Sequence, residues 1–179
     1  MDRTDRRALV LALVDALRAS GSWCGETHVQ KSCYILQRLV GLPTNFEFIL
    51  YKHGPFSFDL QEYFHSLRGD DLIAAAPTGY RYGTSLLVTE HGKKIEQLRS
   101  DLIAKYAAQF KKVSDRLGPK SVRDLEKIAT AVYVTDELGP DKSVEERAKK
   151  ITEYKKHVSF KEATQAVEEF ESIAKELVS

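Results

Sequence analysis

The stretch Tyr51-Lys52-His53-Gly54-Pro55-Phe56-Ser57 decides the predicted fold, because an extended segment ends in it and a helix begins directly after it. Residues 46–51 are too few for a helix and partly alternate between polar and apolar, which is typical of a short strand. Gly-Pro is a strong turn signal, and serine is a favoured helix N-cap. Apolar residues then recur at helical spacing, at Leu60, Tyr63, Phe64 and Leu67. We therefore predict an extended segment, a sharp turn and a helix that starts after Ser57.

Two helices are predicted upstream of this turn. Residues 5–19 are apolar around much of the helical circumference, so we expect this helix to lie between other elements or under a partner. The second helix opens at Thr27, where Thr27 and Gln30 have the spacing of a capping box. Gly41-Leu42-Pro43 ends it.

Downstream, two short apolar runs at residues 72–76 and 85–88 predict a β-hairpin with a long loop. A polar helix is predicted from Thr89 to Leu117. Three further helices follow at about 121–138, 143–154 and 159–178, and each begins with a serine that an acid follows three residues later.

The order helix, helix, extended segment, helix, hairpin, helix is that of a winged helix. We therefore expect a mainly α protein with a small β-hairpin. Its winged-helix-like core covers residues 1–100, and a C-terminal helical extension, residues 101–179, packs on the core. The longest apolar run, Ala8 to Val14, is far shorter than the ~18 residues of a spanning helix, which predicts no membrane partner.

The charge balance argues against the DNA-binding role that a winged helix suggests. The chain has 27 Lys and Arg against 26 Asp and Glu, and the outward face of the third helix leads with Asp59 and Glu62, which oppose a phosphate backbone. The wing tip, Tyr80-Arg81-Tyr82, is a candidate nucleic-acid contact. We expect a protein partner. A winged-helix DNA-binding transcriptional regulator, dimeric through its first helix, is the alternative.

Cys24, His28 and Cys33 lie within ten residues, but their spacing matches no closed zinc site and no second ligand pair follows. We therefore predict no metal and no cofactor. A catalytic Cys–His pair is left open as a third hypothesis, although no phosphate loop, nucleophile elbow or dinucleotide fingerprint supports an enzyme. Two free thiols and the lack of a secretory pattern favour a cytoplasmic location.

Two motifs resemble those of a known family: residues 27–37, THVQKSCYILQ, and residues 51–57 with Leu60. They are similar to the Panacea domain, the family of SocA-type antitoxins, and within it to the YwgA-like branch. Leu87-Val88-Thr89-Glu90-His91-Gly92 is similar to the entry of the family's next helix. The resemblance covers roughly residues 8–100.

The resemblance implies a non-enzymatic, antitoxin-like regulator that binds another protein, such as a cognate toxin. Lys52 and His53 add to the motif residues because a loop on a rigid scaffold often carries function. The predicted partner-binding residues are Gln30, Lys31, Tyr51, Lys52, His53, Gly54, Pro55 and Ser57.

Overall fold

The computed structural model describes residues 2–76 and 84–178. These residues form a mainly α structure with two small antiparallel hairpins, as the sequence predicts for its class. No helix in this part of the chain is both long and apolar enough to cross a membrane. The helices are α1 (Arg3–Ala19), α2 (Glu26–Val40), α3 (Phe58–Gly69), α4 (Glu90–Leu98), α5 (Ser100–Leu117), α6 (Val122–Leu138), α7 (Val144–Tyr154) and α8 (Phe160–Val178). The strands are β1 (Ile49–Tyr51), β2 (Gly54–Phe56), β3 (Ile73–Ala76) and β4 (Ser85–Val88).

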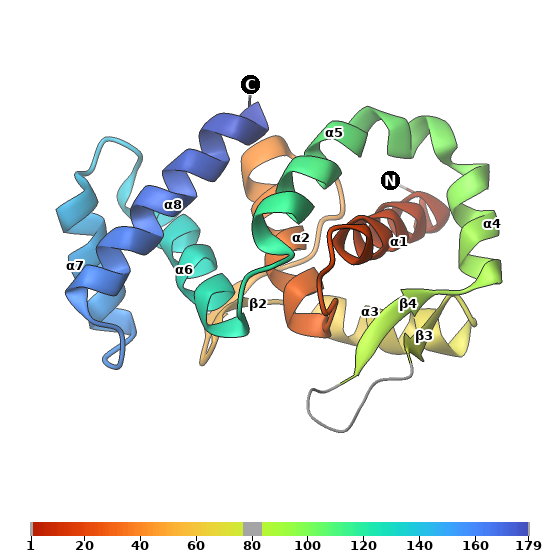
Figure 1. Ribbon diagram of the computed structural model, residues 1–179, viewed down its shortest axis with the longest axis horizontal. Helices are drawn as coiled ribbons and strands as arrows, with labels where there is room; N and C mark the ends of the chain where they lie inside the picture. Colours follow the sequence, from red (N-terminus) through yellow and green to blue (C-terminus); the bar gives the residue numbers. More distant parts are fainter. Residues whose placement is uncertain (1, 77–83, 179) are drawn as a thin grey trace.

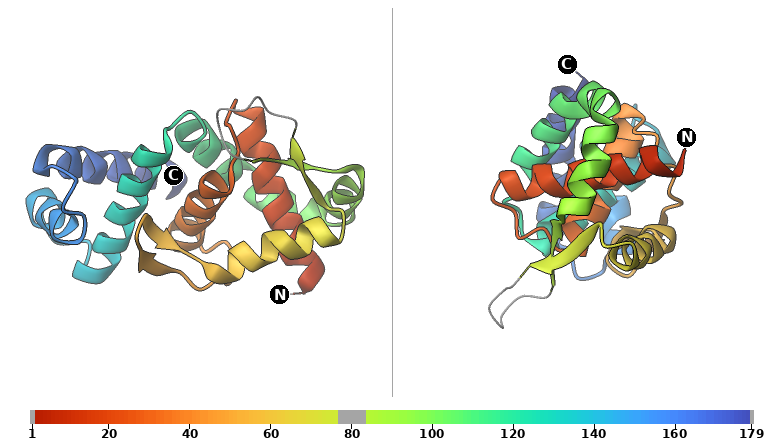
Figure 2. Two further views of the ribbon diagram at one scale, coloured as in Figure 1. Left: turned by 90° about the horizontal axis from the view of Figure 1, so that it is seen from below. Right: turned by 90° about the vertical axis from the view of Figure 1, so that its right-hand side faces the viewer.

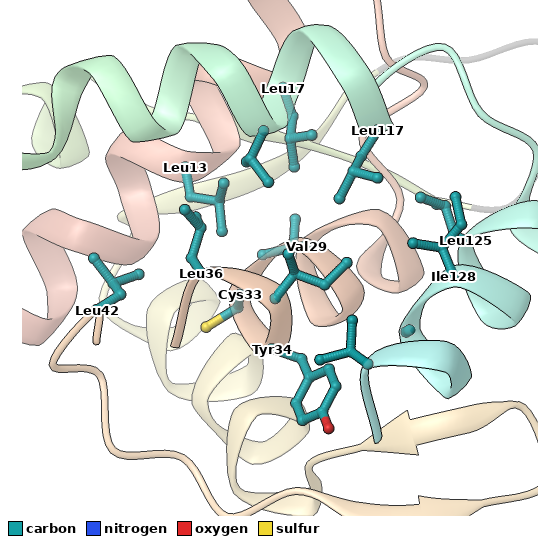
Figure 3. Packing of buried hydrophobic residues seen from close by; sticks show 14 of the residues in the cluster. Leu13, Leu17, Val29, Cys33, Tyr34, Leu36, Leu42, Leu117, Leu125 and Ile128 are labelled. Atoms are coloured by element: carbon teal, nitrogen blue, oxygen red, sulfur yellow. The ribbon is translucent and has the colours of Figure 1, made fainter. Parts of the chain in front are cut away.

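Helix α2 lies at the centre of the molecule, between the amino-terminal elements and the carboxyl-terminal helices α6 to α8 (Figure 1). It contacts α1, α5, α6 and α8, and its buried side chains belong to one continuous apolar cluster. Figure 3 shows Leu17 of α1, Val29 of α2, Leu117 of α5 and Leu125 of α6 meeting in that cluster. One apolar core therefore joins residues on both sides of the predicted boundary near residue 100.

The hairpin β3–β4 is confirmed, with Ile73 opposite Val88. Strand β3 lies beside α3, and β4 lies beside α1 (Figure 2). Arg18 of α1 anchors β4 by donating to Ser85 Oγ and to the Leu86 carbonyl, both at 3.0 Å. The predicted wing contacts Tyr80, Arg81 and Tyr82 lie outside the described residues.

The prediction of one helix from Thr89 to Leu117 is wrong. The backbone leaves the helical conformation at Arg99, with φ −123° and ψ 27°, and α4 and α5 meet there at an angle (Figure 1). Arg99 binds Asp2 at 3.1 Å and Asp5 at 2.7 Å, at the start of α1. The bend lets both helices pack against α1. The local helical pattern does not predict the bend, because these contacts are made with residues far away in the sequence.

The serine caps of the last three helices are confirmed. Ser121 Oγ accepts from the Asp124 N–H at 3.2 Å, and Ser143 forms a reciprocal capping box with Glu146. Ser159 and Glu162 make the same reciprocal pair of bonds at 3.0 and 3.3 Å.

The capping box predicted at Thr27 is wrong. Helix α2 begins one residue earlier, at Glu26, behind Gly25, which makes no side-chain cap bond. The side chain of Gln30 is unavailable for capping because it is hydrogen-bonded 27 residues further along the chain.

Candidate protein-binding surface

Residues 49–56 form a hairpin that the sequence did not predict in full. Strands β1 and β2 pair antiparallel, with Ile49 opposite Phe56 and Tyr51 opposite Gly54, so that Lys52 and His53 make the tip. The prediction that Gly54-Pro55 forms the turn is wrong: the chain turns at Lys52-His53, and Gly54 and Pro55 begin the returning strand. Gly54 still has the conformation that favours glycine, with φ +82°.

Gln30 of α2 holds the end of this hairpin through two hydrogen bonds to one residue. Its Nε2 donates to the Ser57 carbonyl at 2.8 Å, and its Oε1 accepts from the Ser57 N–H at 3.0 Å. Ser57 is fully buried and its Oγ accepts from the Leu60 N–H at 3.1 Å, which caps α3. The amide of Gln30 thus replaces a missing strand for the backbone of Ser57 and positions the start of α3.

Two lysines hold the carbonyls of the hairpin. Lys31 is 1% exposed, and its Nζ donates to the Pro55 carbonyl at 2.7 Å. Lys155, which follows α7, donates to the Tyr51 carbonyl at 3.1 Å and to the carbonyl of Lys52. The pKa of Lys31 is lowered to about 8, mainly by burial; the Glu126 carboxylate opposes the shift and the Lys155 ammonium adds to it. Burial also lowers the pKa of Lys155.

The tip of the hairpin rests on α6. A Cβ added at Gly54 would lie 2.9 Å from Thr130 Oγ1 and 3.1 Å from the Glu126 carbonyl, so only glycine allows this approach. His53 Nδ1 lies 3.2 Å from Glu126 Oε1, although the His53 side chain is otherwise exposed. Helices α2 and α6 therefore clamp the hairpin from two sides.

The predicted partner-binding residues fall into two groups. Gln30, Lys31, Gly54, Pro55 and Ser57 are buried and bonded or packed within the chain, so their observed contacts are those of a scaffold. The remaining three, Tyr51, Lys52 and His53, are exposed on the surface of the hairpin.

The exposed side of the hairpin is apolar. Ile49, Tyr51 and Phe58 are 50%, 45% and 49% exposed. The rings of Tyr51, Phe56 and Phe58 form a cluster. Their centroids are 6.1 Å apart for Tyr51 and Phe56, 5.5 Å for Tyr51 and Phe58, and 5.1 Å for Phe56 and Phe58. We call Ile49, Tyr51, Phe56 and Phe58 the hairpin patch. Exposed apolar residues that gather in one place mark sites of interaction.

Several residues of this surface were missed from the sequence. Phe58 had a signal, because it lies outside the apolar stripe of α3 and a large ring there has no place in the core. Lys155 and Glu126 had no such signal, since each is one of many charged residues in the chain and contacts the hairpin from more than 70 residues away.

A groove lies beside the hairpin patch and shares Ile49 with it. It has a volume of about 580 Å³ and runs between α2, residues 46–49 and the carboxyl-terminal half of α6. Tyr34 and Phe48 meet on its wall with ring centroids 5.0 Å apart. We call it the tyrosine groove, after Tyr34 and Tyr133, which line it.

The residues of the third hypothesis, a Cys–His enzyme, are buried apart from any surface. Cys33 is fully buried with its Sγ 3.5 Å from Thr44 Oγ1, and Cys24 Sγ lies 3.5 Å from the Val14 carbonyl. Burial raises the pKa of each thiol to about 12. A thiol that stays protonated is a poor nucleophile, so the geometry gives no support to catalysis by Cys33.

His28 bonds through Nε2 to the Lys120 carbonyl at 3.1 Å, and burial lowers its pKa. In the part of the chain that the structure describes, no three His, Cys, Asp or Glu side chains are grouped so as to hold a metal ion.

No family model matches the chain, and a comparison with curated proteins finds no matching relative. The resemblance to the Panacea domain therefore stays a prediction that rests on residues 27–37 and 51–60. The structure adds the contacts of those residues: the two motifs bind each other, Gln30 to Ser57 and Lys31 to Pro55.

Proposed function

We propose that this protein is an antitoxin-like regulator that acts by binding another protein through the hairpin patch. The observation that carries the proposal is the cluster of half-exposed apolar side chains on a hairpin that α2 and α6 hold in place. Aromatic side chains contribute much of the affinity at protein interfaces. A surface that is ordered before binding loses little conformational entropy when the partner docks.

The charges of α3 also favour a protein partner over DNA. Asp59 and Glu62 are exposed and form no ion pair with any described residue. Arg68, the cation at the far end of α3, is bound to Glu26 at 2.5 Å. A helix with these charges would repel the phosphates that line a major groove.

The experiment compares partner capture by three chains in the native host. Tagged wild type, the double variant Tyr51→Ala/Phe58→Ala and the control Phe160→Ala are crosslinked, recovered and identified by mass spectrometry. Phe160 is a matched control because its ring is also half exposed but lies on α8, outside the hairpin patch. We expect one partner with the wild type and with Phe160→Ala, and at least about a tenfold loss of it with the double variant.

Growth provides the second measurement. Expression of the captured partner alone is expected to arrest growth, wild-type chain to restore it, and the double variant to fail, although its circular dichroism is native. Equal capture of the partner by the double variant would show that the hairpin patch is not the binding surface. A partner that does not arrest growth when expressed alone would contradict the antitoxin role.

The alternative, a DNA-binding regulator, is tested by salt titration with a random duplex. It predicts that log K falls linearly with log salt, with a slope close to the number of phosphates contacted. We expect no binding at micromolar protein and low salt, whereas a steep slope would favour the DNA-binding role.

A further inference from the structure

The tyrosine groove combines aromatic walls with a negative rim. Four of its lining residues are charged: Arg38 on α2, Glu47 in the segment before β1, and Asp136 and Glu137 on α6. Arg38 Nε donates to Asp136 at 2.6 Å, so these two charges neutralise each other. Glu47 and Glu137 remain, and neither forms an ion pair with a described residue.

Two cations near residues of the groove, Lys150 and Arg6, form no ion pair with Glu47 or Glu137 and contact other groups. Lys150 lies 4.7 Å from the ring of Tyr154 and pairs with Glu153 at 3.4 Å. Arg6 stacks on the ring of Phe46 at 5.2 Å, from the side of α1. Glu137 itself accepts hydrogen bonds from the Tyr154 hydroxyl, 2.7 Å from each carboxylate oxygen. That bond orients the carboxylate and leaves its charge in place.

The walls suit the stem of a long cationic side chain. Phe48 and Tyr133 are partly exposed and line the groove together with Tyr34. Lysine and arginine place their methylene chains on apolar surface while the charged head reaches a polar site, and a cation near an aromatic face gains further attraction. A volume of about 580 Å³ is enough for several side chains of a peptide.

We propose that the tyrosine groove binds a basic segment of the partner protein, with a lysine or arginine side chain placed between Glu47 and Glu137. Charge complementarity identifies the occupant as cationic, and Ile49, which belongs to both surfaces, makes the groove continuous with the hairpin patch. The inference rests on the proposed function and adds the chemistry of the partner: an apolar contact on the patch followed by a basic residue in the groove.

The test uses arrays of nonapeptides with a fixed central residue and degenerate flanks, probed with labelled full-length protein. The central residue is arginine, lysine, citrulline, glutamate or leucine. Citrulline keeps the shape of arginine and removes its charge. We expect the arginine and lysine sets to bind at least about fivefold more strongly than the citrulline, leucine and glutamate sets.

The double variant Glu47→Gln/Glu137→Gln is expected to abolish this preference. The matched control, Glu62→Gln/Glu168→Gln, changes the net charge by the same amount at two exposed positions outside the groove and is expected to keep it. Equal binding of cationic and neutral sets by the wild type, or an unchanged preference in the groove variant, would overturn the proposal.

Two outcomes separate this inference from the proposed function. If Tyr51→Ala/Phe58→Ala loses the cellular partner while Glu47→Gln/Glu137→Gln keeps it at wild-type affinity, the partner-binding role stands and the groove inference is wrong. If sedimentation shows that the chain associates with itself and the groove variant abolishes that association, the occupant is a second copy and the inference is again wrong.

Discussion

At the scale of single residues, the amide of Gln30 shows how a polar side chain replaces a strand. It pairs with both backbone groups of Ser57 in the interior, where water cannot satisfy them. A buried backbone group without a partner costs about 1–3 kcal/mol. The position therefore requires a side chain with one donor and one acceptor.

We predict that Gln30→Leu lowers the free energy of unfolding by about 2–4 kcal/mol, because it leaves the N–H and the carbonyl of Ser57 unpaired. Urea denaturation followed by circular dichroism measures the change. Gln97→Leu, at an exposed position on α4, is the control and should change stability by less than about 0.5 kcal/mol. A loss with Gln30→Leu no larger than that of the control would show that the bonds to Ser57 contribute little.

Keeping Lys31 charged in the interior lowers the stability of the folded chain, because burial disfavours the ammonium form. Its pKa is lowered from 10.5 to about 8, so between these values the unfolded chain holds a proton that the folded chain has released. Stability contributed by this group consequently rises with pH over that window. A shift of this size corresponds to about 3 kcal/mol.

We predict that the free energy of unfolding of the wild type rises relative to that of Lys31→Met as pH increases from 8 to 10.5. The comparison with Lys31→Met is necessary because the buried thiols of Cys24 and Cys33, with raised pKa values, produce the opposite trend in both proteins. Parallel curves for the two proteins would mean that Lys31 is equally basic in the folded and unfolded chains.

At the scale of elements, the β1–β2 hairpin depends on its contact with α6. Gly54 combines a positive φ with backbone and side-chain atoms of α6 about 3 Å from the place of a Cβ. Gly21 has a similar φ, +79°, but open space around it. Comparing alanine substitutions at Gly54 and Gly21 therefore separates two contributions to the loss of stability: the strain of a positive φ, which both share, and the steric clash with α6, which only Gly54 has.

We predict that Gly54→Ala destabilises the protein more than Gly21→Ala does, by about 1–3 kcal/mol, because the added methyl group must displace α6 or the hairpin. Thermal or urea unfolding of the two variants measures the difference. The displaced hairpin is also expected to bind the partner more weakly, whereas Gly21→Ala should bind normally. Equal destabilisation by the two variants would argue against a close contact with α6.

At the scale of the whole molecule, one apolar core joins the elements on both sides of residue 100. Leu125 and Ile128 of α6 are buried in the same cluster as Val29 and Leu17 (Figure 3). The contacts of Gln30 and Lys31 to the hairpin come from α2, which also contributes Val29 to this cluster, so the hairpin and the helical extension share α2 as a support.

We predict that Leu125→Ala shifts the unfolding of the entire chain by about 2–5 kcal/mol. The single tryptophan, Trp23, lies between α1 and α2 and reports on the amino-terminal half, while circular dichroism reports on all helices. We expect both signals to shift together, as in a two-state transition. An unchanged Trp23 midpoint beside an earlier transition in circular dichroism would mean that residues 101–179 unfold separately.

The sequence by itself determined most of the helices, the β3–β4 hairpin and the serine caps at 121, 143 and 159, because these features depend on side chains within a few residues of one another. It also placed Cys33 in the core from its position on the apolar stripe of α2. Only the tertiary structure decided that α4 and α5 separate at Arg99, that Gln30 bonds to Ser57 instead of capping its own helix, and that Phe58 is exposed while Lys31 is buried. These outcomes depend on partners such as Asp5, Ser57 and Pro55, which lie 24 to 94 residues away along the chain. No local sequence pattern specifies which of many similar side chains will be in contact.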